Sequence, residues 1–390
     1  MLNQSKLPNV GTNIFTTMSK MAVDYSAINL GQGFPDFNAD EKLLKLVSQA
    51  MLDGYNQYPL MTGISELREV ISNKVKDLYG KYYEPNQEIT ITSGATEAIM
   101  ASILATVQYG DEVIVIEPSY DCYVPAIKLA GGNPVFVKMS PPTESKPYFS
   151  VNWNNVKDSV TSRTRMLIVN SPHNPTGSVF NAEDLDAIES IVLNTKIIVL
   201  SDEVYEHIVF DGEKHLSLAS RPMLAGRTFV ISSFGKTTHT TGWKIGYCCA
   251  PKELTTELRK VHQFIVFTVP SPFQYGLASY TKDPQTYLNL SDFYQKKRNK
   301  LMEGLQDTKL TPLSSPGTYF LLADYSQISD KTESEFSIWL ARNHGVVVIP
   351  VSAFYAEPES VSANHQLVRF CFAKKDTTLD AALDRLKKIT

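Results

Sequence analysis

Short apolar runs alternate with amphipathic stretches along the chain from about residue 90 onward. The runs are rich in Val and Ile and show little alternation of polar and apolar positions, which is typical of strands covered on both faces. The segments between them, such as 181–193 and 254–264, carry apolar residues at helical spacing. This order predicts an α/β fold in which β-α units surround a mostly parallel sheet. Seven strands are predicted, at residues 88–92, 112–116, 134–137, 166–169, 197–200, 229–231 and 245–249.

The pattern changes after about residue 285. A long amphipathic stretch at 287–305 precedes apolar runs at 317–322, 346–350 and 367–372, and a helical pattern follows at 379–388. This mixture predicts a smaller α+β domain whose strands return toward a site on the large sheet. We expect an N-terminal segment, 1–45, that contributes to the small domain and the pocket, a large domain at 46–285 and a small domain at 286–390. The chain shows no internal repeat and no linker rich in Pro, Gly and Ser, so the domains should pack closely.

Composition excludes several classes of protein. A net charge of −4 gives no electrostatic case for binding nucleic acid or an anionic membrane surface. No apolar run approaches the roughly eighteen residues that a membrane helix needs, and residues 1–8 lack the apolar core of a signal peptide. The four cysteines show no metal-like spacing, and the adjacent Cys248 and Cys249 are typical of small core residues in a reducing compartment. We therefore expect a cytoplasmic protein without a metal site.

Lys236 is the candidate residue with the most informative surroundings. It follows the predicted strand 228–231, at the C-terminal end, where α/β folds keep their ligands. Ser233, three residues before it, and Lys244, eight residues after it, could share one dianionic group. The arrangement suits a lysine that forms a Schiff base with an aldehyde cofactor whose phosphate is held nearby. The alternative is a solvated surface loop, since most of the 37 Lys and Arg residues must be surface charges.

Asp202 stands at the end of another predicted strand, 197–200. A carboxylate there can pair with a protonated pyridine nitrogen and keep that ring an effective electron sink. Tyr205 lies three residues later, and Asn174 lies in a Pro-rich turn upstream; both could hydrogen-bond the phenolic oxygen of such a cofactor. Each also has a plainer explanation, because a carboxylate can cap a helix and Asn is common in turns for conformational reasons.

The segment Ser93-Gly94-Ala95-Thr96-Glu97 follows a strand and opens a helix predicted at 98–107. Backbone N–H groups at such a helix start form an anion site, here from Ala95 and Thr96, although most Gly-turns before helices only cap. With Ser233 and Lys244 this start would complete a phosphate-binding cup.

Two further residues stand in apolar surroundings. Tyr120 follows a strand and could stack on the face of a pyridine ring, or could be a buried tyrosine at the sheet edge. Arg369 lies between Val368 and Phe370 in an apolar strand and needs a partner if it is buried. A substrate carboxylate held by both arms of the guanidinium would be one partner, and a structural ion pair would be another.

Together these residues resemble the class I, fold-type-I pyridoxal-phosphate aminotransferases over nearly the whole chain. The branch that is most similar holds methionine aminotransferases, kynurenine aminotransferases and glutamine transaminase K, with the bacterial methionine aminotransferases nearest. Lys244 stands where many members carry Arg. The lysine keeps the positive charge but lacks the bidentate fork of a guanidinium. No tryptophan lies between Gly11 and Phe15, where kynurenine aminotransferases place one in the pocket. The motifs that carry the resemblance are, in order, 29–36, 58–63, 93–96, 174–177, 201–205, 232–247 and 369–370.

The resemblance implies a pyridoxal 5′-phosphate enzyme that moves an amino group from an amino acid to a 2-oxo acid by a ping-pong mechanism. Methionine and aromatic amino acids are the expected donors, with glutamine possible. A homodimer is implied, in which Tyr58 reaches the cofactor phosphate of the partner subunit. The implied catalytic residues are Lys236, Asp202 and Tyr205, and the implied substrate contacts are Gly33, Asn174, Arg369, Phe15 and Phe34.

Two alternatives remain beside this interpretation. A cysteine-conjugate β-lyase or a kynurenine-type aminotransferase would use the same early chemistry. A non-catalytic cofactor-binding sensor, as in regulators that fuse a DNA-binding domain to an aminotransferase-like domain, would need a further domain. The motifs begin near residue 5, so we expect no such domain here.

Overall fold

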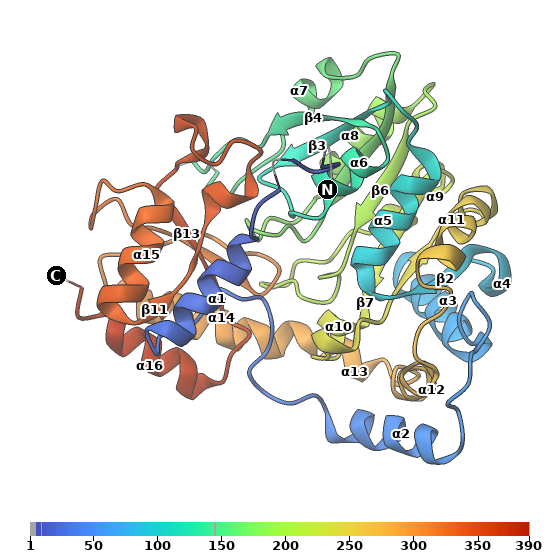
Figure 1. The fold of residues 1–390 in the computed structure, drawn as a ribbon, viewed down its shortest axis with the longest axis horizontal. Coiled ribbons are helices and arrows are strands. Elements are labelled where there is room, and N and C mark those ends of the chain that lie inside the picture. Colours follow the sequence, from blue (N-terminus) through green and yellow to red (C-terminus); the bar gives the residue numbers. More distant parts are fainter. Residues whose placement is uncertain (1–4, 9, 144–145, 390) are drawn as a thin grey trace.

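A seven-stranded sheet forms the centre of the larger part of the molecule (Figure 1). The computed structural model describes residues 5–8, 10–143 and 146–389. The strand order is β2-β8-β7-β6-β5-β3-β4, and β8 alone runs antiparallel to its neighbours within this sheet. All seven predicted strands are confirmed. Their bounds are β2 (Ile89–Thr92), β3 (Glu112–Glu117), β4 (Asn133–Lys138), β5 (Thr164–Asn170), β6 (Ile198–Asp202), β7 (Thr228–Ser233) and β8 (Gly246–Cys249).

Both faces of this sheet are covered, which explains the unbroken apolar runs. Val113 and Val115 pack with α5 (Gly94–Thr106), α6 (Tyr123–Leu129) and α11 (Lys252–Ile265). Ile114 and Ile116, the alternate residues of the same strand, pack in a second core with α7 (Trp153–Asp158) and α8 (Ala182–Val192). Near β2 and β8 a third core is built from α2 (Glu41–Leu52), α3 (Ser65–Tyr79) and α12 (Ser271–Tyr280). Since side chains alternate between faces along a strand, the central strands are apolar on both faces, while the edge strand β4 keeps exposed positions such as Lys138.

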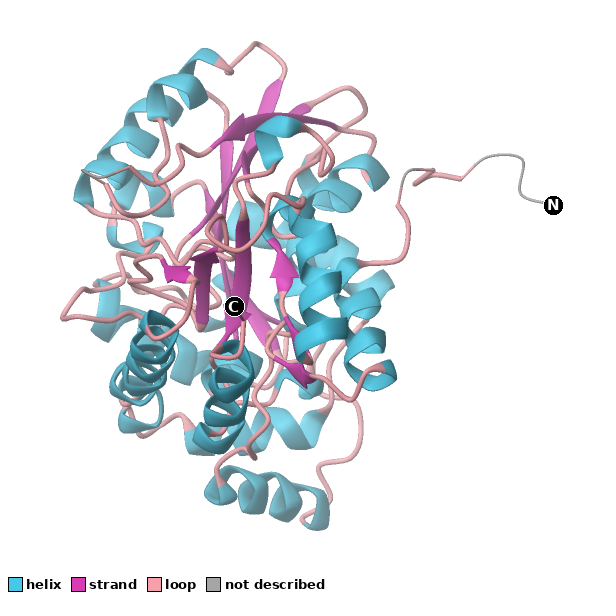
Figure 2. Cartoon of the chain, turned by 90° about the vertical axis from the view of Figure 1, so that its left-hand side faces the viewer, coloured by secondary structure: helices cyan, strands magenta, loops and turns pink. Residues whose placement is uncertain are grey.

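A second, smaller layer of strands and helices lies beside the large sheet (Figures 1 and 2). Its four-stranded antiparallel sheet has the order β12-β13-β10-β9, and β1 pairs in parallel with β11. Helix α1 (Ile14–Asp24) packs on this part through Met18 and Met21, beside α15. The strands are β1 (Ile28–Asn29), β9 (Thr311–Pro312), β10 (Phe320–Asp324), β11 (Val346–Val347), β12 (Ile349–Pro350) and β13 (Leu367–Cys371), and the helices are α14 (Leu290–Gln306), α15 (Glu333–His344) and α16 (Asp376–Leu386).

Some element boundaries differ from the prediction for local reasons. Helix α5 begins at Gly94 rather than at residue 98, because the Glu97 carboxylate accepts the Ser93 backbone N–H and caps the first turn. The amphipathic stretch 287–305 is divided at Asn289 between α13 (Gln285–Leu288) and α14. The remaining short helices are α4 (Pro85–Glu88), α9 (Pro222–Ala225), α10 (Phe234–Thr237), η1 (Leu218–Ser220), η2 (Thr241–Trp243), η3 (Val351–Phe354) and η4 (Val361–Ala363).

The carboxyl ends of the parallel strands meet along one edge of the large sheet. Asn170 ends β5 and pairs with Asp202, which ends β6, and Ser233 ends β7. The chain therefore gathers its candidate polar residues at one sheet edge, facing the smaller layer.

Among the described residues no helix combines the length and the apolarity needed to cross a membrane.

Candidate active site

A cavity of about 260 Å³ lies at this edge, between the large sheet and the strands β10 and β13. Every predicted site residue except Tyr58 lines it. These residues are Phe15, Gly33, Phe34, Ala95, Thr96, Tyr120, Asn174, Asp202, Tyr205, Ser233, Lys236, Lys244 and Arg369.

Lys236 lies in α10, a single helical turn that follows β7 directly. Its Nζ donates to the Tyr319 hydroxyl at 2.8 Å and to the Gly33 carbonyl at 3.3 Å. The Tyr319 hydroxyl in turn donates to the same carbonyl at 2.6 Å. Burial lowers the pKa of Lys236 to about 8, because a desolvated ammonium ion is disfavoured. A useful fraction of this amine is therefore neutral near pH 7–8, as a nucleophile or a base requires.

Asp202 is buried at the end of β6, and its hydrogen-bond partners are neutral. The Tyr123 hydroxyl donates to its carboxylate at 2.6 Å, and the Val204 backbone N–H donates at 3.4 Å. Burial raises the pKa of Asp202 to about 6, an effect that these two donors only partly offset. A buried carboxylate of this kind favours a cationic ligand group in the cavity.

Gly94, Lys244 and Gly246 build a tight turn region at the start of α5. Gly94 has φ +70°, and a Cβ placed on it would lie 3.1 Å from the Lys244 Nζ. Gly246 pairs with both Thr92 and Ser233, and a Cβ on it would come within 2.8 Å of the Ala95 nitrogen. Only glycine allows this approach. The Lys244 ammonium group, Ser233 and the first N–H groups of α5 therefore lie together at the cavity. Together they form a cup for a dianion.

Arg369 lies in β13 and is 1% exposed. Its guanidinium donates to the Asn174 Oδ1 at 2.7 Å and to the Gly31 carbonyl at 2.9 Å, while its Nε has no partner among the described residues. The Cζ atom of the guanidinium lies 3.8 Å from the centre of the Phe320 ring. Burial lowers the pKa of Arg369 to about 10. Both hydrogen-bond partners of Arg369 are neutral. Its positive charge is therefore not engaged in a hydrogen-bonded ion pair with any described residue, and the guanidinium can bind an anion.

Phe354, which the family resemblance places around the pocket although not as a substrate contact, does not line the cavity. Its ring packs edge-on against Phe15, with centres 5.9 Å apart, and lies 4.9 Å from the Arg369 guanidinium. Phe354 is 3% exposed and supports the two residues that do reach the cavity. The short helix η3 places it one layer behind the wall.

Sequence reasoning missed several residues of the site. The Tyr123 hydroxyl donates to Asp202, and the Tyr319 hydroxyl accepts from Lys236, with the centre of the Tyr319 ring 5.1 Å from that of the predicted Tyr205. The signal that could have found Tyr319 is its place in an apolar strand region, since a buried phenol needs a partner. Gln32, Asn170 and Phe320 also line the cavity.

Tyr58 lies outside the cavity of its own chain. Its side chain is 84% exposed and meets Phe267 edge-on, with ring centres 5.6 Å apart.

A sequence model of the family described as aminotransferase class I and II matches residues 25–386. The chain belongs to this family. It is an enzyme of the aminotransferase type, and it depends on pyridoxal 5′-phosphate as the family does. Its α/β architecture with a mostly parallel sheet is that of fold type I.

Similar aminotransferases cover the whole chain. Methionine aminotransferase of Escherichia coli (strain K12) is 46% identical over 390 residues, covering 100% of this chain and 99% of that protein. A crystal structure from E. coli, described as identifying a methionine aminotransferase function, has a TM-score of 0.95 with full coverage of both chains. N-succinyldiaminopimelate aminotransferase from Mycobacterium tuberculosis has a TM-score of 0.94 at 40% identity, again with full coverage. Human kynurenine–oxoglutarate transaminase 3 is 36% identical and covers 99% of this chain and 90% of its own length.

Proposed function

We propose that this aminotransferase uses methionine and aromatic amino acids as its main amino donors, with glutamine as a further donor. The observation that carries the proposal is the charge of the cavity wall. Among the described residues that line it, the cations are Lys236, Lys244 and Arg369, and the first two have other tasks. One arginine is left for the α-carboxylate, and a second carboxylate on the side chain would lack a partner. The similarity to E. coli methionine aminotransferase supports the same assignment.

The side-chain part of the cavity is aromatic. Phe15, Phe34, Tyr120 and Phe320 line it, and Gln32 is an amide among them. Such a wall accepts a thioether or an aromatic ring, since sulfur packs favourably against aromatic edges. An apolar pocket distinguishes similar side chains by only about 1–3 kcal/mol per methylene. The enzyme should therefore accept several apolar donors rather than one.

The residues present fit pyridoxal 5′-phosphate. The cup at the start of α5 would hold the phosphate together with Ser233 and Lys244. Positions 94 and 246 must be glycine for this cup to form, because a larger residue at either would collide with its neighbours. Asp202 would face the pyridine nitrogen, and Lys236 would bind the aldehyde carbon. Asn174 and Tyr205 would hydrogen-bond the phenolic oxygen, and Tyr120 would stack on the ring.

The chain's own groups perform the remaining steps. When bound, the cofactor supplies a sink for the electrons left at the substrate Cα after proton loss. Arg369 binds the α-carboxylate through charge-assisted hydrogen bonds and so orients the Cα–H bond. Lys236 takes the proton from Cα with an amine that burial keeps partly neutral. Asp202 would retain a proton on the ring nitrogen of the bound cofactor. Release of a 2-oxo acid ends the first half-reaction, and a second 2-oxo acid then accepts the amino group.

We propose further that two copies of the chain share their active sites. Exposed apolar side chains gather near the Tyr58 loop: Tyr58 is 84% exposed, Leu60 67%, Phe264 85% and Phe267 45%. Exposed apolar clusters of this kind mark interaction sites. A homodimer would cover them and carry Tyr58 to the phosphate cup of the partner subunit. Sedimentation of the purified enzyme should give a dimer, and Tyr58→Phe should weaken cofactor binding; a monomeric active enzyme would contradict the proposal.

We also propose that the large domain begins near residue 46, that the small domain begins near residue 286, and that the protein is cytoplasmic. The four cysteines are unpaired, and Cys248 and Cys249 are buried, as suits a reducing compartment.

One panel of amino donors tests the specificity. Each amino acid is assayed against several 2-oxo acids, and kcat/KM is compared. Methionine and phenylalanine should exceed aspartate clearly. A kcat/KM for aspartate equal to that for methionine would overturn the specificity while leaving the family membership intact.

A further inference from the structure

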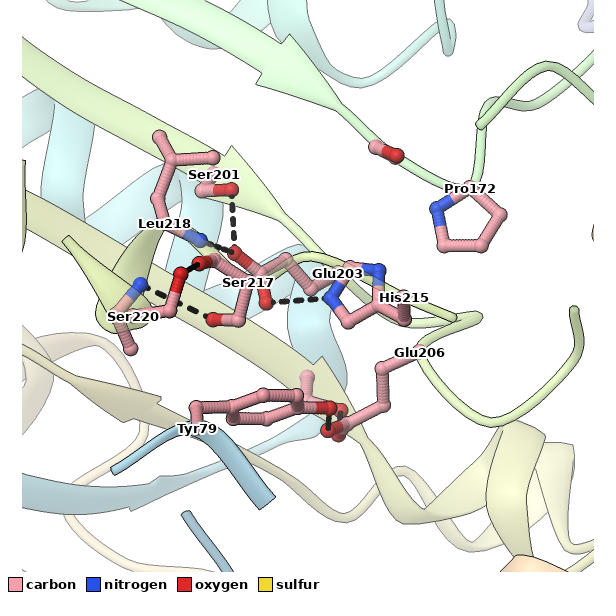
Figure 3. A network of polar contacts seen from close by, with 12 residues as sticks. Tyr79, Pro172, Ser201, Glu203, Glu206, His215, Ser217, Leu218 and Ser220 are labelled. Carbon is pink, nitrogen blue, oxygen red and sulfur yellow. Dashed lines mark hydrogen bonds and ion pairs between the residues drawn. The ribbon is translucent and has the colours of Figure 1, made fainter. Parts of the chain in front are cut away.

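The segment 202–206 presents its residues to two sides of the sheet edge, with Val204 on the cavity side. Asp202 and Tyr205 line the cavity. Glu203 and Glu206 are equally buried, at 2% and 5% exposure, but do not line it. Figure 3 shows the two glutamates pointing to separate groups of polar partners behind the site. The mechanism uses neither of them, so their role needs another explanation.

Glu206 gathers donors from three different elements. Lys74 of α3 donates to its Oε1 at 2.6 Å, and Tyr79 of the same helix donates to its Oε2 at 2.7 Å. Ser232 of β7 and Tyr247 of β8 donate to its Oε1 at 2.6 and 3.0 Å. Tyr247 also accepts from Lys74 at 2.6 Å. The carboxylate is thus fixed from α3 and from two strands of the large sheet.

Glu203 is held on the other side by the segment that follows the site. Ser201 and the Leu218 N–H donate to its Oε1 at 2.7 and 3.1 Å, and His215 lies 2.9 Å from its Oε2 (Figure 3). Its partners lie on the chain segment 201–218 itself, whereas those of Glu206 come from distant elements. Glu206 is therefore the anchor that ties the segment to the rest of the fold.

The charge balance around Glu206 shows that it is ionised. Burial opposes ionisation, but Lys74 and the hydroxyl donors outweigh it, and they hold the pKa of Glu206 below its ordinary value. The nearby His207 has its pKa lowered to about 3, first by burial, and is neutral. A buried ion pair is often no more stabilising than apolar residues of the same volume. What four converging donors do supply is a fixed position for the residue that precedes Glu206 in the chain.

That preceding residue is Tyr205, and the centre of its ring lies 5.6 Å from the Lys236 Nζ. We propose that Glu206, held by Lys74, is a positioning residue that keeps the Tyr205 phenol aimed at the cofactor oxygen beside Lys236. The inference rests on the proposed role of Tyr205. A phenol that donates to this oxygen stabilises its anionic form and so lowers the proton affinity of the neighbouring lysine nitrogen. Loosening Glu206 should raise that proton affinity without removing any group from the cavity.

The test uses the cofactor-loaded enzyme and the pH midpoint of its visible absorption change. Tyr205→Phe should move the midpoint up by about one pH unit, the value of one hydrogen bond to a charged group. Glu206→Gln should move it in the same direction. In the Tyr205→Phe background, Glu206→Gln should add nothing, because its effect passes through the phenol. No shift in Glu206→Gln, or an equal shift in both backgrounds, would overturn the proposal.

Two further variants guard the interpretation. Tyr79→Phe removes one donor and leaves the ion pair, so it should give a smaller upward shift even if Glu206→Gln folds poorly; an unchanged midpoint would count against the proposal. Glu112→Gln is the matched control. Glu112 is 7% exposed, accepts from Thr161 and Arg163 and lies at the opposite end of the strands, so this variant should lose stability without moving the midpoint. If wild type shows the transition but Tyr205→Phe leaves it in place, the role of Tyr205 fails instead.

Discussion

Asp202 and Glu206 lie on the same short segment and are almost equally buried, at 4% and 5% exposure, yet they are perturbed in opposite directions. Burial raises the pKa of Asp202 to about 6, and its donors are a phenol and a long N–H contact. The pKa of Glu206 is lowered because Lys74 and the hydroxyl donors outweigh burial. The difference lies in the partners and not in the depth. On the cavity side of the segment, here called the front, the Asp202 carboxylate has no cationic hydrogen-bond partner among the described residues. On the opposite side, the back, the Glu206 carboxylate has one cationic and three hydroxyl donors.

The incomplete front costs the free chain stability, and the satisfied back holds that front in place. Lys236 and Arg369 face the same cavity: the pKa of Lys236 is lowered, and the Arg369 Nε has no hydrogen-bond partner in the described part of the chain. Groups of this kind are retained for the ligand they meet, since active sites commonly sacrifice stability for function. Substitutions at the front should therefore damage turnover and spare the fold, while substitutions at the back should chiefly cost stability and act on the site only through the position of Tyr205.

The largest effect is expected from Lys236→Ala. Turnover should be lost, because the other amine among the described residues that line the cavity, Lys244, is assigned to the phosphate cup. The variant should still bind the cofactor through the phosphate cup, with its visible absorption band altered. Its cofactor-free form should melt no lower than wild type, since a buried amine has been removed. Near-normal turnover with an unchanged band would exclude Lys236 from this role.

Asp202→Asn should lower kcat by several orders of magnitude, because an amide cannot hold the proton on the ring nitrogen. The cofactor-free variant should be more stable than wild type at neutral pH. The folded-state pKa, about 6, lies above the unfolded value near 3.9, so folding is progressively disfavoured as pH rises through that interval. The gain above pH 6 is on the order of 1–3 kcal/mol. Thermal melting between pH 4 and 8 measures it, and a loss of turnover below about tenfold would make Asp202 structural.

Lys74→Met tests the back of the segment. Removing the cation leaves the Glu206 carboxylate buried with hydroxyl donors only, which should cost about 3–5 kcal/mol of unfolding free energy. Denaturant unfolding measures the loss. Lys45→Met is the matched control, because Lys45 pairs with Glu41 on an exposed surface and should contribute little. Equal stability of the two variants would remove the contrast between front and back.

Arg369→Ala should raise KM by roughly two orders of magnitude for every amino acid and 2-oxo acid, which corresponds to a few kcal/mol. The α-carboxylate is common to all of these substrates, so the increase should be uniform. Steady-state kinetics with methionine, phenylalanine and their 2-oxo acids measures it. An increase confined to some side chains would move Arg369 to the side-chain pocket.

The smallest effect concerns His262, which links the cup to the Tyr58 loop. Its Nδ1 lies 2.9 Å from the Glu97 carboxylate, and its Nε2 lies 2.9 Å from the Met61 carbonyl. Burial lowers the pKa of His262, but Glu97 outweighs burial and raises it overall, with Arg259 opposing. The stabilisation should be complete below the unfolded pKa near 6.5 and lost as pH rises through the higher folded value. Melting temperatures of wild type and His262→Gln should therefore converge toward alkaline pH; a constant difference would contradict the charged pair.

The large sheet could be predicted from sequence because burial on both faces leaves unbroken Val and Ile runs such as 112–116. Lys236, Asp202 and Ser233 could be placed because each follows such a run directly. The partners behind the site could not. Lys74 meets Glu206 from a helix far away in the chain, and a charged residue on an amphipathic helix normally faces water.

Aromatic residues set a second limit. Tyr319 reaches Lys236 while Phe354 packs one layer behind, although both lie in apolar segments near strands of the small sheet. Local hydrophobicity is alike in the two cases, and only the packing of β10 against the large sheet decides which ring reaches the cavity. The start of α5 is similar, since its cap depends on the Glu97 side chain rather than on the periodicity that predicts the helix.

The close approach of Gly246 to Gly94 and Ala95 has a consequence for folding kinetics. Within the large sheet β2 pairs only with β8, and more than half of the large sheet's strands lie between them in the chain. Long-range pairings close large loops and form slowly. The phosphate cup therefore cannot exist in a nascent chain that ends before β8, and the ability to bind phosphate should appear late in refolding. Cofactor capture thus reports that β2 and β8, the first and last strands of the large sheet in chain order, have paired.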